Sequence, residues 1–344
     1  MASRHTDPDI SSSTIEIDTD HGRKNIHIRR STNITTQDHP VVVLVPGLGL
    51  GCLTFTTIQS ELAKSGIASF TYDRLGIGRS SSLPLLESTD RDSEKKTPKP
   101  RTASALAQEL DAVLHAAALK SPFVFITHSA GGLTIWEYTA AHSENSAGVV
   151  FLDANSPRSI ERAVMDPDLE FLADGIKGGL DYCSVIGLDD AHHMSGAEWE
   201  ELNGQRDPPE GWTKGENGGW AEMLGWHDSC RDLARHDLVS KHPLGDRPVT
   251  VIKGFSERDI RKAIAYSEAK GGGTNEQREE LLRKMEGCDV LEEECQREHL
   301  MLTGTGERRF VFAHSSGHYP HITEQDQVVS EIERMVRLVR RNGK

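Results

Sequence analysis

Short, nearly continuous apolar runs recur along the chain, and each ends at residues typical of turns. Successive side chains of a strand point to opposite faces, so a run without polar alternation indicates a strand that is covered on both faces. Such strands are typical of parallel sheets, which carry helices on both sides. The pattern predicts six strands of a parallel sheet, within residues 41–45, 68–72, 123–126, 149–152, 249–252 and 310–313.

Several segments between and after these runs place apolar residues at helical spacing instead. Residues 102–119 begin at Thr102, a residue type that caps helix starts. Strand and helix therefore alternate, which is the signature of a doubly wound α/β fold. Residues 14–17 and 25–30 alternate more and predict an antiparallel edge hairpin. The helical spacing is carried by Leu106, Leu110, Val113, Leu114 and Ala117 in the first segment and by Val328, Ile332, Val336 and Val339 near the C-terminus.

Long insertions separate some neighbouring core strands by more than one helix needs. The longest predicts a helical cap over residues 155–247, inserted into a core made of residues 1–154 and 248–344. A smaller insertion is predicted at residues 261–289, and the polar segment 80–100 is predicted to be a surface loop. Four tryptophans of the cap segment are expected either to line an apolar pocket or to form the cap's own core. These are Trp199, Trp212, Trp220 and Trp226.

The net charge of the chain, −14 at pH 7, narrows the range of partners. Nucleic acid and anionic lipid both need basic surface clusters, so neither is expected as a partner. The cysteines are odd in number and match no disulfide or zinc spacing, so we expect reduced thiols. The N-terminus lacks the apolar region of a secretory signal, and no apolar run is long enough to span a bilayer. We therefore expect a cytoplasmic protein without a membrane segment, and the oligomeric state stays open.

Residues 123–132 carry the strongest chemical signal: an apolar strand runs into Ser129, small residues follow, and a helix begins. This context is that of a nucleophile elbow, a turn so sharp that the neighbours of the serine must be small. Ala130 and Gly131 meet that requirement, whereas Thr127 replaces the first glycine of the G-x-S-x-G pattern. We expect Ser129 to be a nucleophile; the alternative is a serine that only caps the helix.

Three further motifs, each at the end of a predicted strand, complete a family pattern. They are V-P-G-L-G at residues 45–49, Y-D-R-L-G-I-G-R-S at residues 72–80 and S-G-H at residues 316–318. With these motifs the chain resembles the α/β-hydrolase family over nearly its whole length. The resemblance implies the α/β-hydrolase fold, which is a mostly parallel, doubly wound sheet with an inserted helical cap.

The general base follows from the same resemblance. A serine hydroxyl needs a base to accept its proton, and a histidine titrates near neutral pH. His318 lies between the last predicted strand and the last predicted helix, where the family places this histidine. His314 and His321 are rivals on the same segment.

A carboxylate is expected to orient the imidazole of the base, and two places compete for it. Asp153 ends the predicted strand 149–152, where its side chain is held rigidly over the sheet edge. Glu257 and Asp259 follow the next strand, and members of the family use both places. We favour Asp153 and keep Glu257 and Asp259 as alternatives.

Attack on a carbonyl creates an oxyanion, which needs preorganised donors. The backbone amide of Ala130, at the start of a helix, is one expected donor. By resemblance the amide of Leu48 is the other, with Gly49 as the alternative.

Together these residues predict a serine hydrolase that cleaves an ester, lactone or thioester of a moderately large apolar molecule through an acyl-enzyme. No cofactor or metal is expected, because His192-His193 and His227-Asp228 match no zinc spacing. The long polar insertions resemble those of fungal enzymes that process polyketide-type metabolites. Two alternatives stay open: the same triad can cleave a C–C bond or serve a lyase or an acyltransferase, and the fold can serve a ligand receptor without catalysis.

Overall fold

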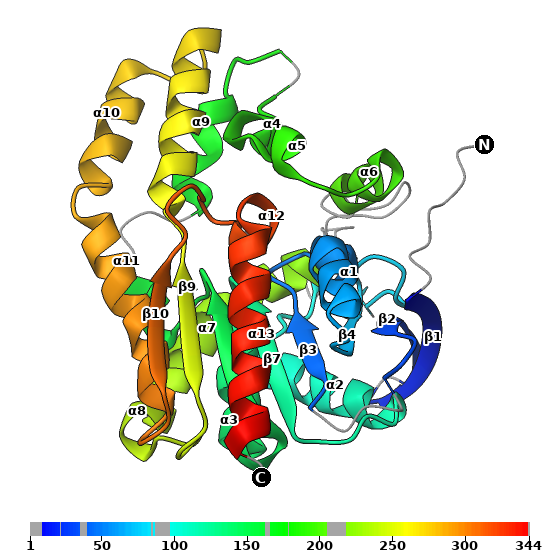
Figure 1. Ribbon diagram of the computed structural model, residues 1–344. Helices are drawn as coiled ribbons and strands as arrows, with labels where there is room; N and C mark the ends of the chain where they lie inside the picture. The colour runs from blue at the N-terminus through cyan, green and yellow to red at the C-terminus, as the bar shows by residue number, and fades with distance from the viewer. Residues whose placement is uncertain are drawn as a thin grey trace.

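The computed structural model describes residues 9–20, 22–34, 40–83, 85–86, 97–161, 166–177, 179–204 and 218–342. An eight-stranded sheet lies at the centre of the fold, with the strand order β1-β2-β4-β3-β7-β8-β9-β10 (Figure 1). The strands are β1 (Ile10–Thr19), β2 (Gly22–Ser31), β3 (Val42–Val45), β4 (Ser69–Tyr72), β7 (Phe123–His128), β8 (Ser146–Leu152), β9 (Val249–Lys253) and β10 (Arg308–Phe312).

The six strands from β4 to β10 run parallel, which confirms the predicted parallel sheet. Val43 lies opposite Phe70 of β4 and Phe125 of β7. The N-terminal strands form the predicted antiparallel hairpin, in which Ile15 pairs with Ile26, and β2 joins the sheet antiparallel to β4. Every residue of β3, β7 and β8 is buried, as expected for strands covered on both faces.

Helices cover both faces of the sheet (Figure 1). One face packs against α1 (Thr56–Lys64) and α13 (Gln325–Asn342), and the core cluster there includes Val42 and Val336. The other face packs against α2, α3 and α7, and its core cluster includes Phe125 and Leu110. These helices span Ala103–Ala116, Gly131–Ala141 and Gly218–His236.

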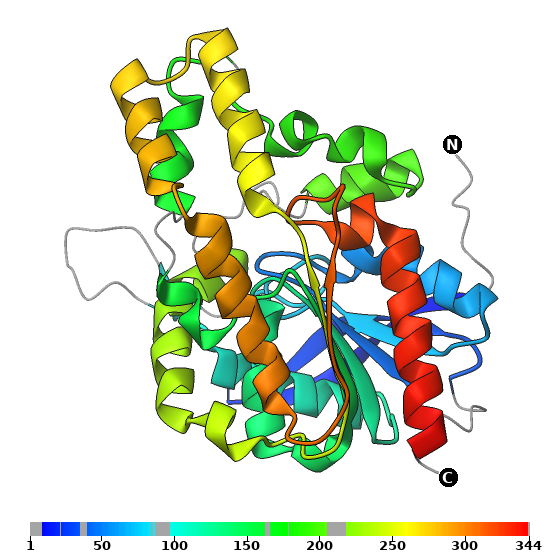
Figure 2. The ribbon, with the colours of Figure 1, turned by 60° about the vertical axis from the view of Figure 1, so that its left-hand side comes forward.

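A second group of helices lies beyond the carboxyl ends of the parallel strands (Figures 1 and 2). The short helices α4 (Tyr182–Ile186), α5 (Leu188–Ala191) and α6 (Gly196–Gly204) come from the predicted cap segment. They are joined by α9 (Ser256–Lys270) and α10 (Asn275–Lys284), which come from the smaller predicted insertion. An apolar cluster that includes Leu172, Ala263 and Leu281 holds the two insertions together. The helices of the cap segment therefore lie in two places, because α7 packs on the core.

The remaining elements are short or connect the core to these helices. Most of the segment 80–100 and Trp212 lie outside the described residues. Across the described residues, no helix is both long enough and apolar enough to cross a membrane. The remaining elements are η1 (Cys52–Phe55), β5 (Leu85–Leu86), β6 (Thr97–Pro98), η2 (Ser143–Asn145), η3 (Pro157–Glu161), η4 (Asp166–Ala173), α8 (Leu238–Lys241), α11 (Cys288–Arg297), η5 (Glu298–Leu302) and α12 (Pro320–Thr323).

Candidate active site

Ser129 lies on a sharp turn between β7 and α3. Its φ of 52° is in the left-handed region, which costs a non-glycine residue about 1–2 kcal/mol. The following turn is closely packed, because a Cβ on Gly131 would lie 2.7 Å from the carbonyl oxygen of Pro46 and from Thr127 Oγ1. Glycine at position 131 therefore makes room for the threonine that departs from the family pattern. The strained serine and its small neighbour form the elbow that the sequence predicted.

His318 lies on the loop between β10 and α12, with its imidazole beside the serine. Its Nε2 is 2.9 Å from Ser129 Oγ. The backbone of the same residue is held from two sides, because its N–H donates to Asp259 Oδ2 at 2.8 Å and its carbonyl lies 2.8 Å from His128 Nε2. These contacts fix both the position and the direction of the ring.

Asp153 completes the hydrogen-bonded chain from the end of β8. Its Oδ2 is 2.6 Å from His318 Nδ1, and the side chain is fully buried. Three more donors reach the carboxylate: the Gly254 amide at 3.0 Å, Ser256 Oγ at 2.8 Å and Gln296 Nε2 at 2.6 Å. Burial alone would raise the pKa of this carboxyl, but the hydrogen bond and charge of His318 and the bond from Gln296 hold the pKa below its ordinary value.

The two alternative carboxylates take other positions. Asp259 is buried and accepts the backbone N–H of His318, so it contacts the loop of the base rather than its ring. Gly317 permits this approach, because a Cβ there would lie 2.1 Å from the Asp259 carboxylate. Burial raises the pKa of Asp259 above its ordinary value, although the His318 amide opposes the shift. Glu257 pairs with Arg261 on the same helix.

The two rival histidines do not replace His318 in this arrangement. His314 is exposed and stacks near Phe255. His321 is buried, lies 3.0 Å from Thr54 Oγ1 through its Nε2, and packs against the ring of His128. Burial, helped by the charge of His318, lowers the pKa of His321 to about 3.

This buried histidine makes stability depend on pH. The unfolded chain protonates His321 near its ordinary pKa of 6.5, whereas the native state resists the proton down to about 3. Stability is therefore lost as pH falls through that window, at up to about 1.4 kcal/mol per pH unit. We expect a loss of about 2 kcal/mol between pH 7 and pH 5 from this one group, measured by denaturant unfolding. The variant His321→Gln should show a flatter profile, whereas His115→Gln, at an exposed position, should keep the slope of the parent. If the free energy of unfolding changed equally with pH in all three proteins, His321 would not be the source of the loss.

The expected oxyanion donors lie at the turn after β3 and at the start of α3. The backbone amide of Gly49 already has an acceptor, because it donates to Glu222 Oε2 at 3.1 Å. Within the described part of the chain, the amides of Leu48 and Ala130 have no hydrogen-bond acceptor. Both residues line a small pocket, which Trp226 of α7 also lines. The amides of Leu48 and Ala130 are thus better placed than that of Gly49 to donate to an oxyanion.

The cap tryptophans within the described residues lie in different surroundings. Trp226 lines it, whereas Trp199 packs with α4 and α5 and stacks on His192. Trp220 is partly exposed. The tryptophans therefore divide between the two expected roles.

A buried ion pair that the sequence pattern did not indicate holds the turn after β3, where the sequence predicts an oxyanion donor. Arg74 donates to the carbonyl oxygens of Pro46 at 2.9 Å and Gly47 at 2.6 Å. Its charge is paired with Glu222 of α7 at 2.6 Å, and both side chains are almost completely buried. The two residues are far apart in sequence, so only the fold brings them together.

Breaking this ion pair should destabilise the protein strongly. Glu222→Ala leaves the Arg74 charge buried and unpaired, which we expect to lower the free energy of unfolding by about 3–5 kcal/mol. Glu201→Ala is the matched control, because its partner Arg79 is 42 % exposed and solvent screens the pair. That variant should lose less than about 1 kcal/mol. Denaturant unfolding of both variants makes the comparison, and equal losses would show that the buried pair has no special importance.

An eight-stranded α/β sheet with serine, histidine and aspartate in one hydrogen-bonded chain at its carboxyl edge defines a hydrolase enzyme. The profile of the Alpha/beta hydrolase family matches residues 42–331, and the chain belongs to this family.

Relatives and solved structures agree with this membership. An "AB hydrolase superfamily protein" from Gibberella zeae is 28% identical over 317 residues, which cover 89% of each chain. A thermophilic esterase from Thermogutta terrifontis aligns with a TM-score of 0.53 and 14% identity over 96% of this chain and 99% of that chain. A serine hydrolase involved in carbazole degradation aligns with a TM-score of 0.52 and 11% identity over 95% of this chain and 100% of that chain. At these identities the structural likeness shows the fold.

Proposed function

We propose that the protein is a serine hydrolase that cleaves an ester, lactone or thioester of a moderately large apolar metabolite, of polyketide type, through an acyl-enzyme. The observation that carries the proposal is the unbroken chain of hydrogen bonds from Ser129 through His318 to Asp153. Nucleophile, base and orienting acid stand in the order and at the distances that acyl transfer requires.

In the proposed reaction, Ser129 Oγ attacks the carbonyl carbon while His318 Nε2 takes the hydroxyl proton. The amides of Leu48 and Ala130 stabilise the oxyanion, and Asp153 stabilises the imidazolium. When the C–O or C–S bond breaks, His318 returns the proton to the leaving group. Water, activated by the same imidazole, then releases the acid and restores the serine.

The substrate class is supported by the helices beyond the sheet edge. We propose that residues 155–247 include the cap that covers the substrate, with α9 and α10 bound to it. The apolar side chains of Leu106, Leu133 and Trp226 in the pocket favour an apolar substrate. No disulfide joins any of the five cysteines, which supports a cytoplasmic location.

Covalent labelling followed by product analysis tests the proposal. A fluorophosphonate should add to Ser129 in the folded protein, as seen by mass spectrometry of the digested chain. Aryl esters, aryl lactones and thioesters should then yield the free acid. Cleavage of a β-diketone alone would move the function to C–C bond hydrolysis. An unlabelled serine together with an inert substrate panel would favour a ligand receptor.

A further inference from the structure

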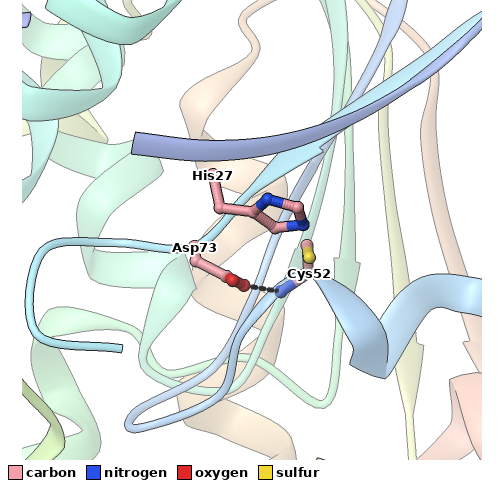
Figure 3. A group of neighbouring side chains, drawn as sticks. All are labelled: His27, Cys52 and Asp73. Carbon is pink, nitrogen blue, oxygen red and sulfur yellow. Dashed lines mark hydrogen bonds between the residues drawn. The ribbon is translucent and has the colours of Figure 1, made fainter. Parts of the chain in front are cut away.

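Three buried side chains from separate segments, none of them a member of the Ser129 site, converge in the core (Figure 3). His27 comes from β2, Cys52 begins η1, and Asp73 directly follows β4. One ligand atom from each residue lies within 4.8 Å of the other two. In the described part of the chain, this is the one group of such side chains close enough to share a metal ion.

The ring of His27 and the carboxylate of Asp73 both keep lone pairs that a metal ion could use. His27 is 7 % exposed, yet its ring nitrogens have no hydrogen-bond partner among the described residues. Asp73 is fully buried, and its carboxylate accepts the backbone amides of Cys52 at 2.7 Å and Arg79 at 3.0 Å. No described cationic side chain forms an ion pair with it. Each Asp73 oxygen thus has one donor already, and a second lone pair on it remains for a metal ion.

The arginines beside this cluster are already paired elsewhere. Arg29 lies 3.8 Å from Glu198, and Arg79 forms a 2.6 Å ion pair with Glu201, both on α6. Both arginines thus have their ion pairs on α6. A positive ion between the three side chains would leave these pairs intact.

The ligand set fits zinc. Zinc binds cysteine thiolate, neutral histidine and carboxylate, and a thiolate and a carboxylate together balance its two positive charges. A bound ion displaces the thiol proton of Cys52 to solvent. Ligand atoms around tetrahedral zinc lie about 3.5 Å apart, which is within the 4.8 Å that separates these three groups at most.

We propose that His27, Cys52 and Asp73 bind a zinc ion that joins η1 to strands β2 and β4. The site is structural, and a water completes its fourth position. The helices α4–α6 pack on Cys52 and Leu53 through one apolar cluster, so the ion would also stabilise the surface on which those helices pack. Arg74, which holds the turn after β3, is the next residue after the ligand Asp73.

Metal content of the purified full-length protein is the first test. After expression with zinc and removal of loosely bound ions, we expect about one zinc per chain by elemental analysis. Cys52→Ser and His27→Gln should each lower that content at least about tenfold. Cys230→Ser is the matched control, because Cys230 is equally buried but lies on α7. Zinc-free protein as purified that also fails to take up added Zn²⁺ would overturn the proposal, as would full zinc content in Cys52→Ser.

Two measurements on the unmodified chain keep the test independent of how the variants fold. Replacement by Co²⁺ should give a thiolate-to-cobalt absorption band in the near ultraviolet. X-ray absorption at the zinc edge should show one sulfur neighbour at about 2.3 Å with lighter atoms at about 2.0–2.1 Å. A first shell without sulfur would overturn the proposal, because it would place the ion away from Cys52.

Discussion

Ser129→Ala should lower turnover by about 10⁴- to 10⁶-fold on any ester, lactone or thioester that the protein hydrolyses. The variant keeps the oxyanion amides and the pocket, so substrate should still bind, but no covalent acyl-enzyme can form. We expect the Michaelis constant to change little while the turnover number collapses. Steady-state kinetics and intact-mass analysis of trapped intermediates measure the two effects.

Alanine at position 129 also removes a side chain from a strained left-handed position, so folding must be controlled. The variant should match the parent in circular dichroism and unfolding midpoint, since alanine costs no more strain there than serine. Ser315→Ala, at an exposed serine near His318, should retain full turnover. Substantial residual hydrolysis in Ser129→Ala, with unchanged substrate specificity, would refute the assigned nucleophile.

The sequence predicted the parts of the site that depend on local structure. Ser129 and His318 stand where a buried strand gives way to a turn, and the carboxyl ends of parallel strands meet at one edge of a sheet. The hydrophobic runs together with the family resemblance therefore indicated both positions. The 2.9 Å contact between them follows from this shared edge.

Other contacts depend on segments that local patterns do not connect. Gln296 reaches Asp153 from α11, and Glu222 reaches Arg74 from α7. Neither residue belongs to a motif that can be read from the local sequence. The cluster of His27, Cys52 and Asp73 could not be predicted from the sequence either, because the spacing of these residues matches no metal-binding pattern.

The sequence favoured Asp153 but could not exclude Asp259 as the acid that orients His318. Both follow core strands, and both are buried within hydrogen-bond distance of His318. Only the direction of each side chain separates them, since one meets the ring and the other meets the backbone N–H. This difference arises from the Gly317 turn, whose missing Cβ admits the Asp259 carboxylate below the loop.

Substitutions at Asp153 and Asp259 should therefore change turnover by very different amounts. Asp153→Asn should lower turnover by about 10³- to 10⁴-fold, because an amide facing Nδ1 favours the wrong tautomer and cannot stabilise the imidazolium. The neighbouring donors Ser256 and Gln296, which now satisfy a charge, would meet a neutral group. Kinetics of the purified variant at several pH values measure the loss, which should persist across the range.

Asp259→Asn should act differently, because its remaining carbonyl oxygen can still accept the His318 amide. We expect a loss of less than about tenfold, whereas Asp259→Leu, which removes the acceptor, should cost at least about ten times more. Glu257→Gln, whose parent residue pairs with Arg261, should be nearly neutral. If Asp259→Asn instead matched the loss of Asp153→Asn, the negative charge at position 259 would itself serve the base. The acid would then be shared between two strand ends, and Asp259 would do more than position the loop.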